Sequence, residues 1–250
     1  PQPFTTVEND ASLIEQIWPA FYAAVAANDE LDADYANLVA DLGIYNTKLT
    51  LEKALSKRLE FKLADAAGSL QNSIAPLDTA FPQLSRYDSI EAAIAPTSML
   101  HTQLRDHAAA LLQCSGKIEP KQAALLNSAL DAGDWAGCCK ATLTKGEPGS
   151  ALRKPPEGQA ATAIILELQD WENHRLTLAH QARMVRLTRE LIAQYQAHKA
   201  QSGQIDMVDV EEAAKRLLTD SPLSAWMQEK LDAQGRHLLI DEFQDTSPLQ

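Results

Sequence analysis

The sequence predicts a mostly helical protein with a small α/β portion at its carboxyl-terminal end. Ala, Leu, Gln, Glu and Lys are plentiful, whereas glycine accounts for 10 of the 250 residues. These residue types favour helices, and the β-branched runs that favour strands are few. Apolar residues also recur at three- and four-residue steps along much of the chain, as on the buried face of a helix. One apolar run near the end, residues 238–240, is typical of a short buried strand instead.

The amino-terminal part of the chain predicts three helices. Residues 10–27 carry apolar residues at helical spacing, with a kink expected at Pro19. A second helix is expected over residues 32–42, ending at Gly43, because glycine is the preferred residue just beyond a helix. Residues 47–67 predict a third, amphipathic helix with leucines near one face and basic residues on the rest.

The middle of the chain predicts shorter helices and one long loop. Prolines and serines break residues 68–95 into short pieces, after which helices are expected over residues 97–113, 120–130 and 131–140. Residues 145–158 are rich in proline and glycine next to basic residues, so we predict a loop that is a candidate for disorder.

One long helix, or two nearly continuous ones, is predicted over residues 159–201, where neither glycine nor proline occurs. Such a helix can bridge two subdomains. A further helix is expected to run to Leu218, with Asp206 as its cap, and another to begin at Ser221 and end before Gly235.

The charge of the chain is −12 at pH 7, which disfavours binding of nucleic acid by bulk electrostatics. Residues 1–47 contain no Lys or Arg, whereas basic residues gather between residues 174 and 199. Arg183, Arg186 and Arg189 are therefore the candidate DNA contacts. A solvated helix face is the alternative and has more weight, because no aromatic residues interleave for base stacking.

Composition also disfavours several protein classes. No apolar run approaches the roughly 20 residues of a membrane-spanning helix, and no signal region is evident, so we expect a cytoplasmic protein without membrane contact. Cys114, Cys138 and Cys139 are too few and too unevenly spaced for a disulfide framework or a zinc site. We expect reduced cysteines and no zinc.

The sharpest chemical pattern is the closing stretch, residues 236–250. The apolar run Leu238–Ile240 is followed by two carboxylates, Asp241 and Glu242, which is the layout of a Walker B element. Asp241 at the carboxyl end of a strand can hold hydrated Mg²⁺ against nucleotide phosphates, and Glu242 can orient and deprotonate water. The alternative is a core strand that runs into a solvated acidic turn.

The pattern extends over ten residues, Asp-Glu-Phe-Gln-Asp-Thr-Ser-Pro-Leu-Gln, and resembles motif II of the UvrD/Rep helicases of superfamily one, particularly the RecB-like and AddA-like helicase-nucleases. Upstream, Ile205–Val210 is similar to the Leu-Asp-Phe-x-Asp-Leu element of that family, with Met207 in place of Phe. Tyr195 and Lys199 match the Tyr-x-x-x-Lys that leads into it. Residues 38–61 resemble the family's accessory helices more weakly, and no functional residue is carried over from them.

The resemblance implies an ATP-dependent DNA helicase or translocase. Asp241 would bind Mg²⁺, Glu242 would act as the general base, and Gln244 and Asp245 would contact and couple the nucleotide site. DNA is the implied partner, and a second helicase-nuclease subunit is a further candidate. The implied fold is a helical accessory subdomain over residues 1–175, followed by a bridging helix and a remnant of a RecA-like α/β motor domain over 176–250.

A Walker B element requires a phosphate-binding loop of the Gly-x-x-x-x-Gly-Lys-(Ser/Thr) kind, and this sequence has none. Both Gly116-Lys117 and residues 133–140 depart from the pattern. We therefore expect an internal fragment that hydrolyses no ATP by itself. Because a parallel strand normally needs neighbours, we also expect the residues after about Arg236 to be poorly held, to pair with another copy or to pack irregularly. The alternative function is a helical protein–protein interaction module without motor activity.

Overall fold

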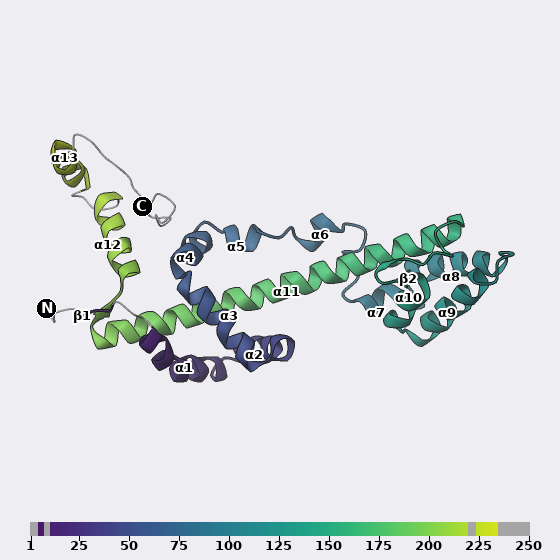
Figure 1. Cartoon of the computed structure of the whole chain (residues 1–250), viewed down its shortest axis with the longest axis horizontal. Coiled ribbons are helices and arrows are strands. Elements are labelled where there is room, and N and C mark those ends of the chain that lie inside the picture. The colour runs from purple at the N-terminus through teal and green to yellow at the C-terminus, as the bar shows by residue number, and fades with distance from the viewer. Residues whose placement is uncertain (1–4, 8–10, 220–223, 235–250) are drawn as a thin grey trace. The chain divides into compact units, whose positions relative to one another are not determined.

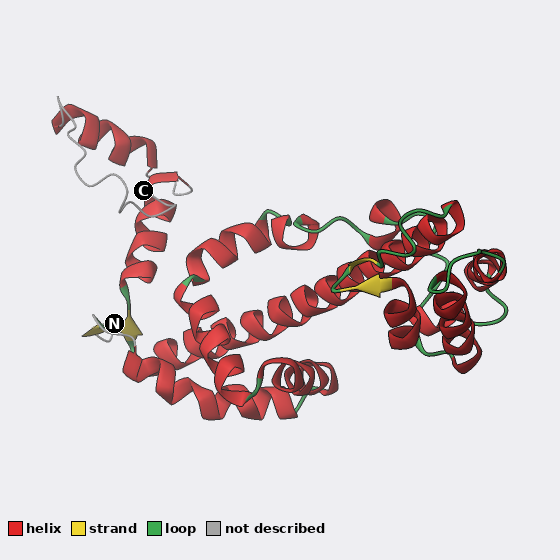
Figure 2. Cartoon of the chain, turned by 45° about the vertical axis from the view of Figure 1, so that its right-hand side comes forward, coloured by secondary structure: helices red, strands yellow, loops and turns green. Residues whose placement is uncertain are grey.

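The computed structural model describes residues 5–7, 11–219 and 224–234, and helices make up most of them (Figures 1 and 2). The prediction of a mostly helical fold is confirmed. The chain divides into two compact units. The first combines residues up to 71 with residues from 181 onward, and the second consists of residues 72–180.

The first unit begins with four helices that follow one another closely. They are α1 (Ala11–Ala26), α2 (Asp29–Leu42), α3 (Ile44–Ser56) and α4 (Arg58–Ala66). The side chain of Asn28 caps α2 by accepting hydrogen bonds from the amides of Glu30 and Leu31, at 3.0 and 3.2 Å. Gly43 separates α2 from α3 at φ 79°, a backbone angle that glycine adopts without strain.

The single helix predicted over residues 47–67 is wrong. The chain instead forms α3 and α4, which meet at Lys57 with φ −104° and ψ 25°. The break turns α4 so that Arg58 and Leu59 are buried at its first turn. Burial of a charged side chain at this point requires a partner from elsewhere in the fold.

The helix α11 (Pro156–Ser202) is 47 residues long and contributes to both units, as Figure 1 shows. Of the two arrangements predicted over residues 159–201, one long helix or two nearly continuous ones, the single helix is confirmed. Its carboxyl-terminal part packs in the first unit, whose core comprises Leu13, Ile17, Trp18, Phe21, Val25, Leu38, Leu51, Leu55, Leu187, Leu191, Ile192 and Tyr195. This core joins α1, α2 and α3 to one face of α11.

The first unit ends with a strand and two helices. The strand β4 (Gln204–Ile205) pairs in parallel with β1 (Thr5–Thr6), with Thr5 opposite Gln204. It leads into α12 (Met207–Thr219) and then α13 (Ser224–Gln234). The strand predicted over residues 238–241, together with its expected looseness, lies outside the described residues.

The second unit is a small helical domain with its own core. It comprises α6 (Leu77–Ala80), α7 (Ile90–Ile94), α8 (Met99–Leu112), α9 (Glu119–Ala132), α10 (Trp135–Thr142) and the amino-terminal part of α11. The short helix α5 (Ser69–Asn72) lies where the two units meet in the sequence. The core of the second unit includes Trp171, Leu104 and Leu126, each at most 1 % exposed.

The loop over residues 145–158, predicted as a candidate for disorder, is ordered. Its first residues belong to a hairpin of β2 (Leu143–Thr144) and β3 (Glu147–Pro148), whose turn holds Lys145 at φ 55° and Gly146 at φ 82°. Positive angles at both turn positions match the twist of a two-residue hairpin. Leu152 then inserts into the core at 2 % exposure.

The two compact units do not coincide with the subdomains expected over residues 1–175 and 176–250. Residues 1–71 group with the carboxyl-terminal part of the chain because α1 to α4 pack on the last turns of α11. The division into accessory and motor subdomains describes function, and it stays a prediction.

Candidate functional site

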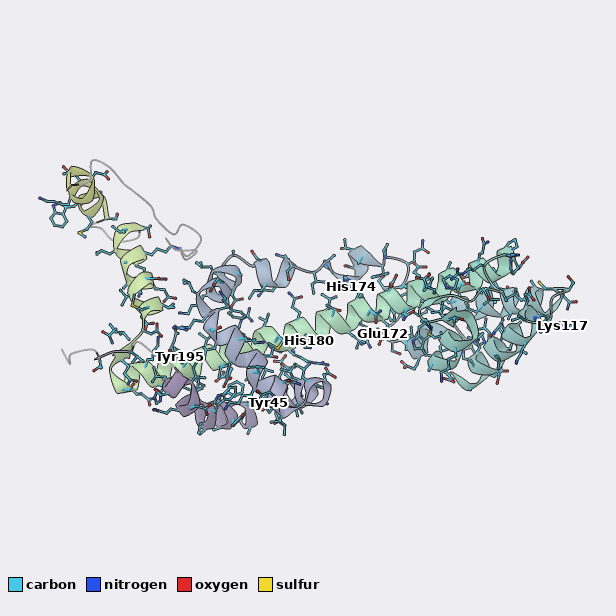
Figure 3. All side chains as sticks on the ribbon, in the orientation of Figure 1. Tyr45, Lys117, Glu172, His174, His180 and Tyr195 are labelled. Carbon is cyan, nitrogen blue, oxygen red and sulfur yellow. The ribbon has the colours of Figure 1, made fainter. Side chains whose placement is uncertain are left out.

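The predicted catalytic and nucleotide-binding residues, Asp241, Glu242, Gln244 and Asp245, lie outside the described residues. The element Ile205–Val210, which precedes them in the sequence, lies within the described residues. Tyr195 lies on the carboxyl-terminal part of α11 (Figure 3), and Lys199 follows it by one turn. Asp206 immediately precedes α12, three residues after Gly203, which has φ 63°.

Asp206 is the centre of a buried ionic cluster. Its carboxylate accepts hydrogen bonds from the hydroxyl of Tyr195 at 2.9 Å and from Nζ of Lys199 at 2.7 Å. The guanidinium of Arg58 pairs with the same oxygen at 2.7 Å. The side chains of Arg58, Lys199 and Asp206 are at most 5 % exposed. We call Arg58, Tyr195, Lys199, Asp206 and Asp209 the Asp206 cluster.

Asp209 completes the cluster and caps the helix. Its carboxylate pairs with Nζ of Lys199 at 2.5 Å and accepts a hydrogen bond from the amide of Asp206 at 3.0 Å. In return, the amide of Asp209 donates to the carboxylate of Asp206 at 3.1 Å. This reciprocal pair is a capping box in which aspartate replaces the usual residues. The expectation that Asp206 caps the following helix is confirmed.

The charges in the cluster fix the ionisation of Asp206. Burial raises the pKa of a carboxyl group, but here the hydrogen bond from Lys199 and the positive charge of Arg58 outweigh it and hold the pKa of Asp206 well below its usual range. Both cations also lie over the ring of Tyr195, with Arg58 at 5.0 Å and Lys199 at 4.7 Å from its centre. The carboxylate stays charged, and α4, α11 and α12 are held together through it.

Sequence reasoning did not include Arg58 among the site residues. Arg58 is far from Asp206 in the sequence, and an arginine in a basic helix is usually solvated. The available signal was its position within residues 38–61, which resemble the accessory helices of the UvrD/Rep helicases only weakly. The fold shows that this arginine is a buried partner of Asp206.

The three candidate DNA-contacting arginines on α11 each pair with a carboxylate of α2 or α4. The nitrogen–oxygen distances are 3.6 Å for Arg183 with Asp41, 2.6 Å for Arg186 with Asp34 and 2.5 Å for Arg189 with Asp65. Arg186 contacts both oxygens of Asp34, whose side chain is 8 % exposed. These pairs balance the arginine charges within the protein, which disfavours phosphate contact at this row.

A pocket of about 600 Å³ lies beside the Asp206 cluster, between α4, the end of α11, β4 and α12. Figures 1 and 2 show α4 and α12 leaving the same side of α11. The apolar lining of the pocket comes from Leu59, Leu63, Ala200 and Ile205. Its charged lining comes from Lys62, Lys199, Asp209, Glu212, Lys215 and Arg216. The volume is in the range of ligand-binding pockets.

Metal and membrane sites are not evident in the part of the chain that the structure describes. Within residues 5–7, 11–219 and 224–234, no group of three or more His, Cys, Asp or Glu is arranged to hold a metal ion. No helix among these residues has the length and apolar character to cross a bilayer. The three cysteines are free thiols, and burial raises the pKa of Cys138 to about 12.

Comparison with known families identifies the chain. The family model of the UvrD/REP helicase N-terminal domain matches residues 28–250. The chain belongs to the UvrD/REP helicase family. Searches of curated proteins and of solved structures returned no match. The match includes the Asp206 cluster and the closing acidic motif, so both belong to the family domain.

Proposed function

We propose that the chain is part of an ATP-dependent DNA helicase or translocase of the RecB/AddA-like subgroup, acting in the cytoplasm in recombination or double-strand break repair. The observation that carries the proposal is the acidic motif of residues 241–250 within a domain of the UvrD/REP helicase family. The parent protein would move along one DNA strand by hydrolysing ATP, and a second helicase-nuclease subunit is its candidate partner.

The proposed chemistry rests on two adjacent carboxylates. Asp241 would hold hydrated Mg²⁺, which neutralises charge on the nucleotide phosphates. Glu242 would orient the attacking water and accept its proton, as a general base does. Gln244 and Asp245 would contact the nucleotide site and couple it to neighbouring motifs. Phosphoryl transfer requires mainly such positioning and charge stabilisation from the protein.

The Asp206 cluster supports this function by position. It fixes the start of α12, and α12 and α13 are the helices that lead to the acidic motif. A buried carboxylate shared by two cations and a tyrosine holds one geometry, because any displacement leaves a charge unpaired. We propose that the cluster anchors the accessory helix α4 to the segment that enters the motor.

The experiment is an ATPase measurement on the protein encoded by the complete reading frame. We expect DNA-stimulated hydrolysis that Glu242→Gln reduces by about 10²- to 10⁴-fold, the usual contribution of a general base. The control variant is Glu229→Gln in α13, which neutralises an exposed carboxylate and should leave turnover unchanged. Turnover that survives Glu242→Gln would exclude the proposed role of this residue.

The 250-residue chain alone gives a second test. It has no Gly-x-x-x-x-Gly-Lys-(Ser/Thr) loop to hold phosphates, so we expect no ATP hydrolysis from it. A malachite-green phosphate assay with and without single-stranded DNA measures this. Hydrolysis by the chain alone that Glu242→Gln abolishes would show that our fragment interpretation is wrong.

A further inference from the structure

The helix α9 of the second unit has an apolar face that is open to solvent. Ile118, directly before the helix, is 55 % exposed, and Leu125, in its middle, is 49 % exposed. Residues 118, 122, 125, 129 and 132 follow steps of four and three, so they lie along one side of the helix. At 1.5 Å per residue, this side is about 21 Å long. Such spacing is typical of a helix that packs against a second helix.

A hollow of about 270 Å³ lies on the carboxyl-terminal half of the same face. Its walls include Leu125, Ser128, Ala129 and Ala132 of α9 and Gly137 and Ala141 of α10. Gly137 lets the two helices approach closely, because a Cβ atom at this position would lie 2.8 Å from the Cβ of Ala129. The hollow is smaller than the roughly 300–1,000 Å³ of small-molecule pockets, so it suits a single apolar side chain better than a ligand.

The two ends of α9 carry opposite charges. Lys117, labelled in Figure 3, directly precedes Ile118, and Asp134 directly precedes α10. Both residues are exposed, so their charges are accessible to another molecule. Asp134 and Lys140 also border the hollow. The aliphatic stem of Lys140 can cover an inserted apolar side chain while its charge stays in water.

These features complement one another when two copies of α9 pack antiparallel about Leu125. Residues equally far from Leu125 on opposite sides then face each other. Ile118 meets Ala132 of the second copy and can fill its hollow, so that large side chains lie against small ones. Lys117 comes close to Asp134 of the second copy, which gives an ion pair at each end. In a parallel pair, Ile118 would meet Ile118, and like charges would meet at both ends.

We propose that this face of α9 binds the same face of a second copy of the chain and forms a dimer with two-fold symmetry. A two-fold interface uses the same residues in both copies, so Leu125 lies at the axis and every other contact occurs twice. The contact is one short helix long, so we expect a reversible dimer with a dissociation constant on the order of 10 µM. The proposal is independent of the helicase function.

The test is sedimentation equilibrium of the 250-residue chain between about 1 and 200 µM, a range that spans the expected dissociation constant. We expect a monomer–dimer equilibrium. Leu125→Glu should weaken it by about 50-fold or more, because two like charges would meet at the centre of the interface.

The matched control is Ile44→Glu, which makes a similar change at an exposed apolar position in the first unit. Ile44 is 68 % exposed in the first turn of α3. This variant should leave the dissociation constant within about 2-fold of that of the unaltered chain, as expected for a surface change away from the interface. Circular dichroism checks that each variant keeps its helices.

Charge reversal tests the antiparallel orientation. Lys117→Glu and Asp134→Lys each place like charges together at both ends of the interface, so each should weaken the dimer about 10-fold. The double variant restores opposite charges, and its dissociation constant should return to within about 3-fold of the original value. A parallel pair would show no such rescue, because Lys117 and Asp134 would lie at different ends.

Four results would overturn the assignment. They are a chain that stays monomeric over the whole concentration range, a dimer that Leu125→Glu leaves intact, equal losses in Leu125→Glu and Ile44→Glu, and a double charge variant no stronger than the single ones. Equal losses would place the contact outside α9. None of these results depends on Glu242, so the helicase proposal is tested separately by the ATPase of the complete protein.

Discussion

Replacing Asp206 with Asn should destabilise the first unit more than any surface change of the same kind. The substitution keeps the size of the side chain and removes one charge. Arg58 and Lys199, both 5 % exposed, then lose their shared carboxylate, and Lys199 keeps only Asp209 among the carboxylates of the cluster. Leaving buried charges without their partner costs about 3–5 kcal/mol. With a urea dependence of about 2 kcal/mol per molar, the unfolding midpoint should fall by roughly 2 M.

The assay is urea unfolding of the 250-residue chain followed by circular dichroism, with Asp65→Asn as the matched control. Asp65 also pairs with an arginine, Arg189, but their side chains are 24 % and 44 % exposed. Exposed pairs contribute about 0–1 kcal/mol, so the control should shift the midpoint by less than about 0.5 M. Equal shifts in the two variants would refute the reasoning that the buried ion pairs of the Asp206 cluster stabilise the fold more than exposed pairs do.

The pH dependence gives an independent check on the same residue. The folded-state pKa of Asp206 is depressed, so its stabilising contribution is fully present above the unfolded pKa of about 3.9 and is lost as pH falls toward the folded pKa. At pH 3 the stability gap between the unaltered chain and Asp206→Asn should shrink by roughly 1 kcal/mol. A gap that stays constant from pH 7 to pH 3 would show that the charge of Asp206 is not the cause. If Asp206→Asn does not fold, Asp209→Asn, which leaves the Arg58 pair intact, replaces it in the urea comparison and should lower the midpoint by a smaller amount.

The remaining predictions concern α11 and the hairpin. Arg186→Ala removes a two-oxygen pair with the nearly buried Asp34, so it should lower stability by about 1–3 kcal/mol in urea unfolding. The same variant should leave the affinity of the chain for a labelled single-stranded oligonucleotide within about 2-fold, and a loss of about 10-fold or more would restore the arginine row as a DNA contact. Lys145→Asn places a residue that tolerates positive φ at 55° in the β2–β3 turn. It should raise the free energy of unfolding by up to about 1 kcal/mol, and the melting temperature with it. A lower melting temperature for this variant would mean that the lysine side chain itself stabilises the hairpin.

Local signals in the sequence were sufficient for most helices. The ends of α2 and α9 follow from glycines, Gly43 and Gly133, whose φ angles are 79° and 63°. Most of the 47-residue helix follows from the absence of glycine and proline between residues 159 and 201. These features act through the backbone of the residue itself or of its neighbours, so they can be recognised without knowledge of the fold.

The break at Lys57 could not be predicted in this way. Lysine is a good helix former, and the local pattern favours a continuous helix. The chain turns there because Leu55 belongs to the core of the first unit, while Arg58 pairs with Asp206, which comes from a distant part of the sequence. A contact between distant segments thus overrides the local preference.

By itself, the sequence determined that this protein is helical and that it resembles the UvrD/Rep helicases, because both conclusions rest on residue types and their order. The tertiary structure alone decided what each charge does. Arg58 is buried against Asp206, Arg186 is paired with Asp34, and Arg216 lines a pocket without an ion-pair partner among the described residues. In the sequence these three arginines look alike. The physical reason is that the role of a charge is set by its burial and its partner, and the partner is brought to it by the fold.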